Sequence, residues 1–279
     1  MTINIQTNIA ALSAQKNLSQ NQKLLAGSFQ RLSSGYRVNS AADDAAGLAI
    51  SESMKSQIRS YTVAQRNAGD AQSMAQTAEG ALGDVHDIMG RMRELAMQSS
   101  NGDLSSTDRG YIATEFKSLQ QEVGRIQKSA QFNGQLLINQ TAPATGAVKF
   151  QVGLNNTASD QISVSFGGVD LSNVITTATT DLSTATGALT ALSTIDAAIQ
   201  TVSTARSNFG TVMNRMDFAT SNIQTMQLNI TAANSRIRDV DVASETASLS
   251  RNQVLTQAGT AVLAQANQIP QLALSLIGH

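Results

Sequence analysis

Few residues in this 279-residue chain have the type and spacing that catalysis or metal binding requires. The adjacent acids Asp43 and Asp44 are candidates for general acid–base chemistry, but they precede a long helical pattern, where a carboxylate stabilises the helix N-terminus. His86 and His279 lack the spacing of metal ligands, and the chain contains no Cys. We therefore predict that the chain is not an enzyme and that it binds no metal and no cofactor.

The composition argues against electrostatic partners. Charged residues make up 14% of the chain, compared with about 25% in an average globular protein. The net charge is −1, so we expect no binding of nucleic acid and no attraction to an anionic membrane. No stretch approaches the ~20 apolar residues that span a bilayer, and the first residues do not resemble a cleavable secretory signal.

Two long apolar repeats provide the scaffold. The first has an apolar residue at every seventh position from Ile195 to Ile237, with a second apolar residue three positions after each one. This a/d pattern is typical of a coiled coil. A second repeat with the same spacing runs from Met54 to Ala96. Many of these residues are Ala, which allows helices to approach closely, so we predict two long helices that pack on each other.

The region between the two repeats changes its periodicity. A third helix is expected after residues 99–106, with Ser105 and Asp108 as its capping box. Apolar residues then alternate with polar ones, which predicts a β-hairpin at about residues 147–166. The stretch 167–193 is rich in Gly, Ser and Thr and forms either a surface connector or an irregular cap. The predicted fold is mainly α: a long antiparallel helical bundle or coiled-coil rod with a small β-hairpin.

Both ends of the chain carry apolar stripes that have no partner in this rod. An isolated helix of their length is only marginally stable in water, so each end must pack on the other end or on neighbouring copies. The pattern therefore predicts self-assembly into a homopolymer. The predicted polymerisation interface consists of Ile5, Ile9, Leu12, Leu18, Leu25, Phe29, Leu32, Leu255, Val262, Ile269, Leu272 and Leu276.

Several long segments point to a known family. They are QRLSSGYRVNSAADDAAGLAIS at residues 30–51, RNAGDAQSMAQTAEGAL at 66–82, RMRELAMQSSNG at 91–102, QFNGQLLI at 131–138, and the run from ANSRIRDVDV to LALSLI at 233–277. Together they resemble the two terminal regions of bacterial flagellins, in long ungapped blocks. This resemblance implies a structural subunit that polymerises into the flagellar filament, the helical propeller of motility.

The resemblance also implies a domain organisation. Residues 1–42 and 240–279 would pair as the inner coiled-coil domain, and residues 43–239 would form the outer helical rod domain with its hairpin. In the family, the terminal segments are disordered in the free subunit and fold on polymerisation. Only a short region separates the two halves here, so a thin, comparatively smooth filament is expected. Ser and Thr residues from Thr141 to Thr194 would lie outermost and are candidates for O-linked glycans.

Further expectations concern partners and export. The resemblance implies a secreted, extracellular protein that leaves the cell unfolded through the flagellar type III channel, without a cleaved signal peptide. Its expected partners are other subunits, hook-associated junction and cap proteins, an export chaperone at the C-terminal helix, and sister flagellins that coassemble. From the residue types alone, we interpret Arg91, Arg93 and Glu94 as a solvated charged face of a helix. The family instead implies that Arg91, Glu94, Leu95 and Glu115 form a rod interface that a vertebrate Toll-like receptor contacts.

Two alternatives have different functions. A hook–filament junction protein of the same superfamily would be low in copy number and would form no long filaments, and the dense match at both ends disfavours it. A flagellin with a zinc peptidase insert would need the HExxH motif, which is absent from this sequence.

Overall fold

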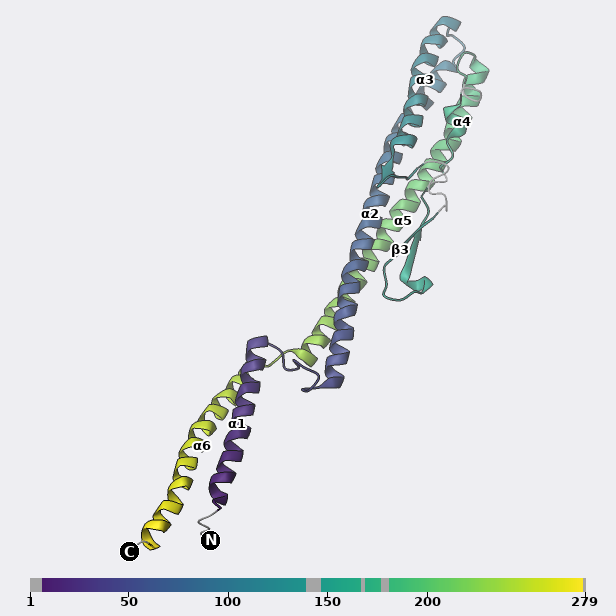
Figure 1. Cartoon of the computed structure of the whole chain (residues 1–279). Coiled ribbons are helices and arrows are strands. Elements are labelled where there is room, and N and C mark those ends of the chain that lie inside the picture. Colours follow the sequence, from purple (N-terminus) through teal and green to yellow (C-terminus); the bar gives the residue numbers. More distant parts are fainter. Residues whose placement is uncertain (1–6, 139–146, 167–168, 177–180, 278–279) are drawn as a thin grey trace. The chain divides into compact units, whose positions relative to one another are not determined.

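The computed structural model describes residues 7–138, 147–166, 169–176 and 181–277, with side chains up to residue 268. The predicted mainly helical fold with a small antiparallel hairpin is confirmed (Figure 1). The elements are α1 (Ile9–Ser34), α2 (Ala45–Ser99), α3 (Ser106–Ser129), β1 (Gln131–Phe132), β2 (Gln135–Leu136), β3 (Val148–Gln151), β4 (Gln161–Val164), α4 (Ser172–Ile175), α5 (Ala185–Arg238) and α6 (Val242–Ile277).

The chain forms two compact units. Unit 1 comprises residues 1–56 and 229–279, and unit 2 comprises residues 57–228. The helices are interrupted at residues 35–44 and 239–241, where the sequence places the boundaries between inner and outer domains. The compact units divide elsewhere, between residues 56 and 57 and between residues 228 and 229. The assignment of inner and outer domains therefore stays a prediction.

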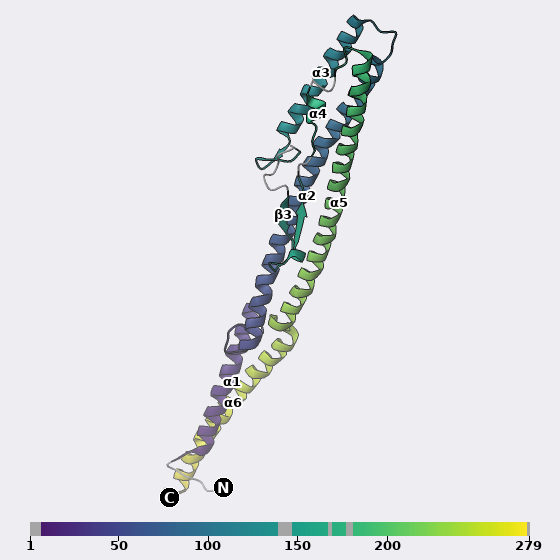
Figure 2. The same ribbon diagram turned by 90° about the vertical axis from the view of Figure 1, so that its right-hand side faces the viewer.

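Unit 2 is an antiparallel bundle of α2, α3 and α5 (Figure 2). Its ion pairs define the direction of the helices: Glu79 on α2 binds Arg206 on α5, and Arg93, further along α2, binds Asp196, which lies earlier on α5. Most of both predicted seven-residue repeats lies in the core of this bundle, but the repeat of α5 leaves the core after Ile223, where its companion residue Met226 is 46% exposed. The buried members at every seventh position in unit 2 are Ala68, Ala75, Leu82, Met89 and Ala96 from α2, and Ile195, Val202, Phe209, Met216 and Ile223 from α5.

The helix α5 begins ten residues earlier than the repeat predicted. Its first turn is capped by Thr184, whose hydroxyl oxygen accepts a hydrogen bond from the Gly187 N–H at 3.1 Å. Ala188 and Ala191 lie one heptad before Ile195 and Ala198, and both are fully buried. The a/d pattern therefore continues through small residues that the surrounding Ser and Thr obscure in the sequence.

The third helix and the hairpin form as expected. Ser105 and Asp108 make a reciprocal capping box at the start of α3. Strands β3 and β4 pair antiparallel, with Val148 opposite Val164. The hairpin is held on the bundle from two sides, because the Asn67 side chain of α2 donates to the Gln151 carbonyl at 3.0 Å and the Phe166 ring lies 5.6 Å from Phe209 of α5.

A second, very small hairpin was not anticipated. Strands β1 and β2 are two residues each and are joined by Asn133 and Gly134, both at positive φ. The Asn-Gly pair is the usual sequence of such a two-residue turn, so the signal was present in the sequence. Of the stretch 167–193, residues 185–193 belong to α5, and residues 169–176 and 181–184 form a cap and not a surface connector, because Val169, Leu171, Val174 and Leu182 are buried in the core of unit 2.

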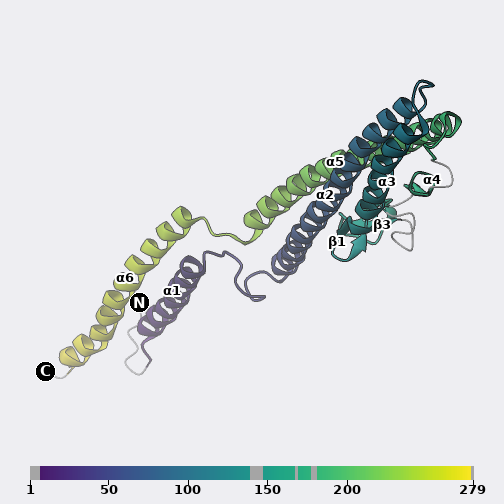
Figure 3. The same cartoon turned by 90° about the horizontal axis from the view of Figure 1, so that it is seen from above.

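Unit 1 contains the antiparallel pair of α1 and α6, which lie side by side (Figure 3). The Asn8 side chain, at the start of α1, donates to the carbonyl of Ala266 near the end of α6, whereas Arg31 near the end of α1 lies 3.8 Å from Glu245 at the start of α6. Among the described residues of this unit, only Val38 and Ala266 are buried apolar side chains. No helix in the described part of the chain is both long and apolar enough to cross a membrane.

Candidate functional site

The outer faces of α1 and α6 carry the exposed part of the predicted interface. Ile9 is 63% exposed, Leu12 65%, Phe29 51%, Leu255 44% and Val262 56%. These residues come from both helices of unit 1 and lie outside the seam between them. Large apolar side chains that stay exposed in one compact unit are typical of a surface that binds another chain.

A different group of predicted residues joins the two helices to each other. Leu18, Leu25 and Leu32 repeat every seven positions along α1 and are half-buried. The Leu18 side chain packs over Gly259, where an added Cβ would lie 3.4 Å from the leucine Cδ1. The predicted interface thus divides into an inner seam and an outer face. Ile5 lies outside the described residues, as do the side chains of Ile269, Leu272 and Leu276, although the backbone of α6 is helical to Ile277.

Three further exposed apolar residues of α1 and α6 were missed. Leu24, Val242 and Val254 are 52%, 60% and 63% exposed. Leu24 and Val254 each precede a predicted residue in the sequence, and the seven-residue spacing selected only one residue of each pair. A search for every large apolar residue on the two terminal helices, without the seven-residue spacing, would have found them.

Both ends of α1 are closed by local interactions. The Asn8 side-chain oxygen accepts a hydrogen bond from the Ala11 N–H at 3.1 Å, which caps the first turn. At the other end Gly35 has a φ of 73°, and its N–H donates to the Arg31 carbonyl. A left-handed glycine is the usual residue after a helix C-terminus, so the break after Ser34 is encoded locally.

A joint of hydrogen bonds ties the two helix breaks of unit 1 together. The Arg37 guanidinium donates to the carbonyls of Arg236 and Ile237, and the Val240 N–H donates to the Gly35 carbonyl. The Arg238 guanidinium lies over the Tyr36 ring at 4.6 Å from its centroid, a favourable cation–π distance.

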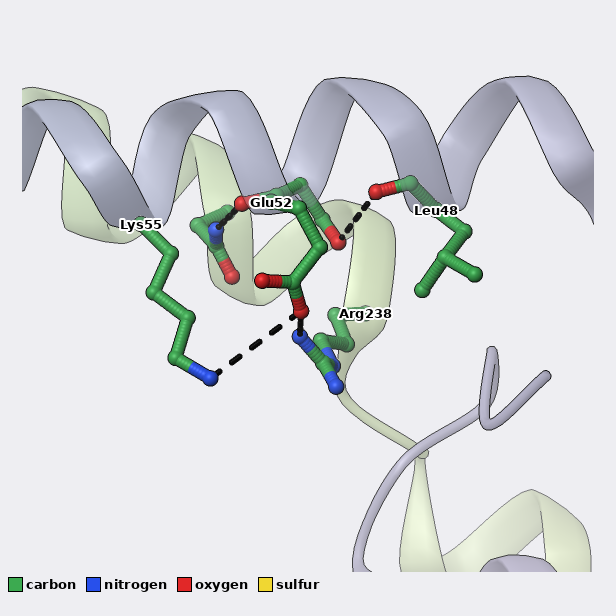
Figure 4. A network of polar contacts seen from close by, with 6 residues as sticks. Leu48, Glu52, Lys55 and Arg238 are labelled. Atoms are coloured by element: carbon green, nitrogen blue, oxygen red, sulfur yellow. Dashed lines mark hydrogen bonds and ion pairs between the residues drawn. The ribbon is translucent and has the colours of Figure 1, made fainter. Parts of the chain in front are cut away.

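The same joint reaches the start of α2 (Figure 4). Arg238 also binds the Glu52 carboxylate at 2.5 Å, and Lys55 lies 4.0 Å from that carboxylate. The Asn234 side chain donates to the Ser51 carbonyl at 2.8 Å. The Arg238–Glu52 and Asn234–Ser51 contacts do not follow from a local periodicity, because they join residues 186 and 183 positions apart.

Asp43 and Asp44 have structural roles. The Asp44 carboxylate accepts from the Gly47 N–H at 2.8 Å, and so caps α2 as predicted. Asp43 instead closes the preceding turn, where it accepts from the backbone N–H groups of Ser40 and Asn39 and from the Ser40 hydroxyl. The backbone hydrogen bond from Ser40 is the largest cause that holds the pKa of Asp43 below its usual value.

In unit 2, three of the four residues expected at the receptor surface form a charged cluster. The Arg91 guanidinium lies 3.0 Å from Glu94 on the same helix and 2.9 Å from Glu115 on α3, and all three side chains are at least half exposed. Hydrogen bonds from Arg91 to Glu115 and then Glu94 raise the pKa of Arg91. Leu95, in contrast, is 2% exposed and belongs to the core beneath the cluster.

The described residues contain no group of three or more His, Cys, Asp or Glu side chains that is arranged to hold a metal ion. His86 is half-buried on α2, and its Nδ1 atom has no hydrogen-bond partner within the described part of the chain.

Comparisons with known proteins agree with this arrangement. The family model described as the bacterial flagellin N-terminal helical region matches residues 5–142, and that of the bacterial flagellin C-terminal helical region matches residues 192–277. A flagellin of Halalkalibacterium halodurans is 43% identical over 274 residues, which are 98% of this chain and 99% of the relative. Flagellin FlaB1 of Treponema pallidum is 38% identical over 285 residues, with the same shares of both chains.

A solved structure extends the likeness to three dimensions. The crystal structure of Bacillus cereus flagellin superimposes with a TM-score of 0.50 at 31% sequence identity, over 61% of this chain and 94% of that one. The chain therefore belongs to the bacterial flagellins, and it is a structural subunit of the extracellular flagellar filament and not an enzyme.

Proposed function

We propose that the outer faces of α1 and α6 are the surfaces through which copies of this chain polymerise. One observation carries the proposal: large apolar residues on both helices, such as Leu12 and Val262, are more than half exposed, while the unit they belong to buries very little. Full burial of a large aliphatic side chain contributes about 1.5–3 kcal/mol. Covering the exposed parts of the outer residues would contribute roughly 5 kcal/mol per subunit before the cost of ordering.

The assignment of an inner domain to residues 1–42 and 240–279, and of an outer rod to residues 43–239, is part of this proposal. The two helix breaks at 35–44 and 239–241 support these boundaries, and the poor burial of α1 and α6 supports an inner domain that depends on other copies. In the filament, the inner domains of many copies would supply the apolar cover that one copy lacks.

A matched pair of substitutions tests the proposal. Leu12→Ser removes a 65% exposed leucine from α1, and Leu189→Ser removes a 56% exposed leucine from α5 in unit 2. We expect Leu12→Ser to raise the critical concentration for seeded polymerisation by about fivefold or more, because it removes apolar area that neighbouring copies cover. Leu189→Ser should leave it close to that of the wild type. Equal effects of the two variants, measured by sedimentation and negative-stain microscopy, would contradict the proposal.

We also propose that the subunit is exported unfolded through the flagellar type III channel without a cleaved signal peptide. A chain without Cys supports this route, because no disulfide can block threading. Mass spectrometry of filament subunits should show that no N-terminal leader beyond the initiator Met has been removed. A shortened N-terminus in every filament subunit would refute this part.

The export chaperone would bind the C-terminal helix. Val254, Leu255 and Val262 are exposed on α6 and need apolar cover before assembly. The same faces would meet hook-associated junction and cap proteins at the two ends of the filament, and sister flagellins within it. Deletion of residues 255–279 should abolish co-elution with the chaperone on size exclusion, and retention of the complex would count against this site.

The cluster of Arg91, Glu94 and Glu115 is proposed as the contact for a vertebrate Toll-like receptor. Their exposure supports this role, and the buried Leu95 would support the cluster from beneath. Arg91→Ala should weaken the response of a receptor reporter. Arg125→Ala is the matched control, because Arg125 forms a similar exposed ion pair with Glu122 on α3. A wild-type monomer that is silent at saturating dose would exclude recognition.

O-linked glycans on the Ser and Thr residues between Thr141 and Thr194 are a separate proposal, supported by their abundance. Residues 141–146, 167–168 and 177–180 of that stretch lie outside the described part of the structure. Intact-protein mass spectrometry of natural filaments tests it, and an unmodified mass would refute it.

A further inference from the structure

The loop between α2 and α3 holds an Asn–Gly pair in an unusual electrostatic setting. Asn101 and Gly102 are exposed, and in the described part of the chain the Gly102 N–H has no hydrogen-bond acceptor. The Asn101 carbonyl oxygen, in contrast, accepts a hydrogen bond from the Arg109 guanidinium at 2.7 Å. The same guanidinium donates to the carbonyls of Ser99 and Leu104, so it is fixed in place by three contacts.

From these contacts we infer that Asn101 is a site of spontaneous covalent modification, deamidation through a succinimide, and that Arg109 promotes it. Hydroxide first removes the proton from the Gly102 amide nitrogen. The resulting negative charge is shared with the Asn101 carbonyl oxygen, which is the atom that Arg109 contacts. A cationic donor placed where charge develops lowers the barrier to that step.

The remaining steps need only water. The Gly102 nitrogen attacks the Asn101 side-chain carbon Cγ, a new N–Cγ bond closes a five-membered ring, and the side-chain nitrogen leaves as ammonia after taking a proton from water. Water then opens the ring at either of its two carbonyl carbons. The products are aspartate, or isoaspartate in which the backbone runs through the former side chain.

Two other sites in the chain show why Asn101 is favoured. Asn133–Gly134 has the same two residues and is also exposed, but it forms the turn of the β1–β2 hairpin with φ values of 48° and 77°. Ring closure there requires the left-handed turn to open, and the described residues place no cation on the Asn133 carbonyl. At Asn39–Ser40, the Ser40 N–H donates to Asp43 at 2.9 Å, which opposes loss of its proton.

The modification changes the surface of unit 2. It adds a negative charge to a loop that already contains Asp103 and whose backbone carbonyls bind the guanidinium of Arg109 on α3. The isoaspartate product also lengthens the backbone between α2 and α3. The change is irreversible without a repair enzyme, and so accumulates with the age of each subunit.

The experiment uses the full-length protein, incubated at mildly alkaline pH and followed by peptide mapping with mass spectrometry. Each conversion raises the peptide mass by about one dalton, and isoaspartate is separated from aspartate by chromatography. We expect Asn101 to convert several times faster than Asn133, at a rate that rises with hydroxide concentration. Conversion of Asn133 at the same rate or faster would overturn the proposal.

Two variants separate the chemistry from loop flexibility. Gly102→Ala is sterically tolerated, because no atom lies within 4 Å of the added Cβ and Gly102 is not at positive φ. It should slow conversion at Asn101 by roughly tenfold or more, because a side chain on the attacking residue hinders ring closure. Arg109→Met should slow it about three- to tenfold, because the charge on the Asn101 carbonyl loses its donor.

The Arg109→Met result is decisive about the role of the arginine. If Arg109 only restrains the loop, its removal makes Asn101 convert faster, and that outcome would overturn the proposed assistance. The rate at Asn133 in the same sample is the internal control and should not change in either variant. Helical circular dichroism confirms that both variants remain folded.

Discussion

Unit 1 and unit 2 are built from the same kinds of residues, yet they bury them very differently. In unit 2, the repeats of α2 and α5 place residues such as Leu82, Met89 and Met216 in a core where they are 0% exposed. In unit 1, the described part of the α1–α6 pair buries almost no large apolar side chain, and residues of equal size stay on its surface. The difference lies in the number of helices, because two helices can cover only one face of each other and a third is needed to enclose a core.

This contrast explains how one chain can be a stable subunit and a component of a polymer. Unit 2 obtains its stability from its own contacts, so it needs no second copy. In unit 1 the ordering of two long helices is offset by little burial, which is why we propose that further burial comes from other chains. Deletions and substitutions confined to one unit therefore test this difference directly.

The largest effect is expected from deletion of residues 255–279. The deletion removes most of α6, and with it most of the partner of α1 and the proposed assembly residues of α6 from Leu255 onward. We expect no filaments at any accessible concentration, measured by sedimentation and electron microscopy. The helical signal and thermal transition of unit 2 should persist, because its core does not include these residues. Filament formation at wild-type yield would contradict the division of roles.

A core substitution in unit 2 should instead lower the stability of the monomer. Leu82→Ala removes a fully buried side chain from the α2 repeat, and should lower the free energy of unfolding by about 2–5 kcal/mol. The matched change Leu12→Ala in unit 1 should lower it by less than about 0.5 kcal/mol, because that leucine is mostly exposed. Chemical denaturation of both monomers provides the measurement. Similar losses in the two variants would show that unit 1 has a core of its own.

The fold could be predicted from the sequence wherever buried residues recur with a regular period. The repeats that include Leu82 and Phe209 were predicted correctly because their spacing of seven places each residue on the same face of its helix. The capping box of Ser105 and Asp108 is equally local. By contrast, the start of α5 was placed too late because Ala188 and Ala191 fill core positions with small side chains that a search for large apolar residues overlooks.

Features formed by residues far apart in the sequence could not be predicted from local periodicity. The joint formed by Arg37 and Arg238 exists only because the fold brings two helix breaks together. The division of the predicted interface into an inner seam with Leu18 and an outer face with Leu12 also required the α1–α6 pairing. Leu95 was expected at a receptor surface by resemblance, yet it is adjacent to the core residue Ala96 and lies in the same core.

A smaller difference in the free energy of unfolding is expected between alanine substitutions of two serines that are both 0% exposed. The Ser99 hydroxyl, in unit 2, donates to the Leu182 carbonyl at 2.8 Å and so joins α2 to the cap before α5. Ser99→Ala leaves that buried carbonyl without a donor and should cost about 1–2 kcal/mol. The Ser51 hydroxyl, in unit 1, donates to Leu48 within its own helix, so Ser51→Ala should cost about 0.5 kcal/mol or less.

Denaturation of the two alanine variants under identical conditions gives this comparison directly. We expect the larger loss of stability for Ser99→Ala because its hydroxyl joins two elements, whereas the equally buried Ser51 hydroxyl bonds within its own helix. The reverse order would mean that the start of α2 is as tightly constrained as the core of unit 2.

The smallest effect concerns the acid sensitivity of the turn before α2. Hydrogen bonds from Ser40 and Asn39 hold the pKa of Asp43 below its value in the unfolded chain. A depressed pKa means that the stabilisation is complete above the unfolded pKa, at about pH 4, and is lost as the pH falls through the lower folded value. Because Asp43 is exposed, the change should be local: hydrogen exchange at residues 39–47 should accelerate in acid, once corrected for the intrinsic rate.

Asp43→Asn should remove this acid dependence, because the amide does not titrate, and exchange in the turn should already be faster at neutral pH. Asp87→Asn, at an exposed position on α2 in unit 2, is the control and should leave the turn unchanged. If the turn of the wild-type protein exchanges equally slowly above and below the titration range, the charge on Asp43 does not stabilise it. The break between α1 and α2 would then depend on Gly35, Asp44 and the Arg37–Arg238 joint alone, none of which involves that carboxylate.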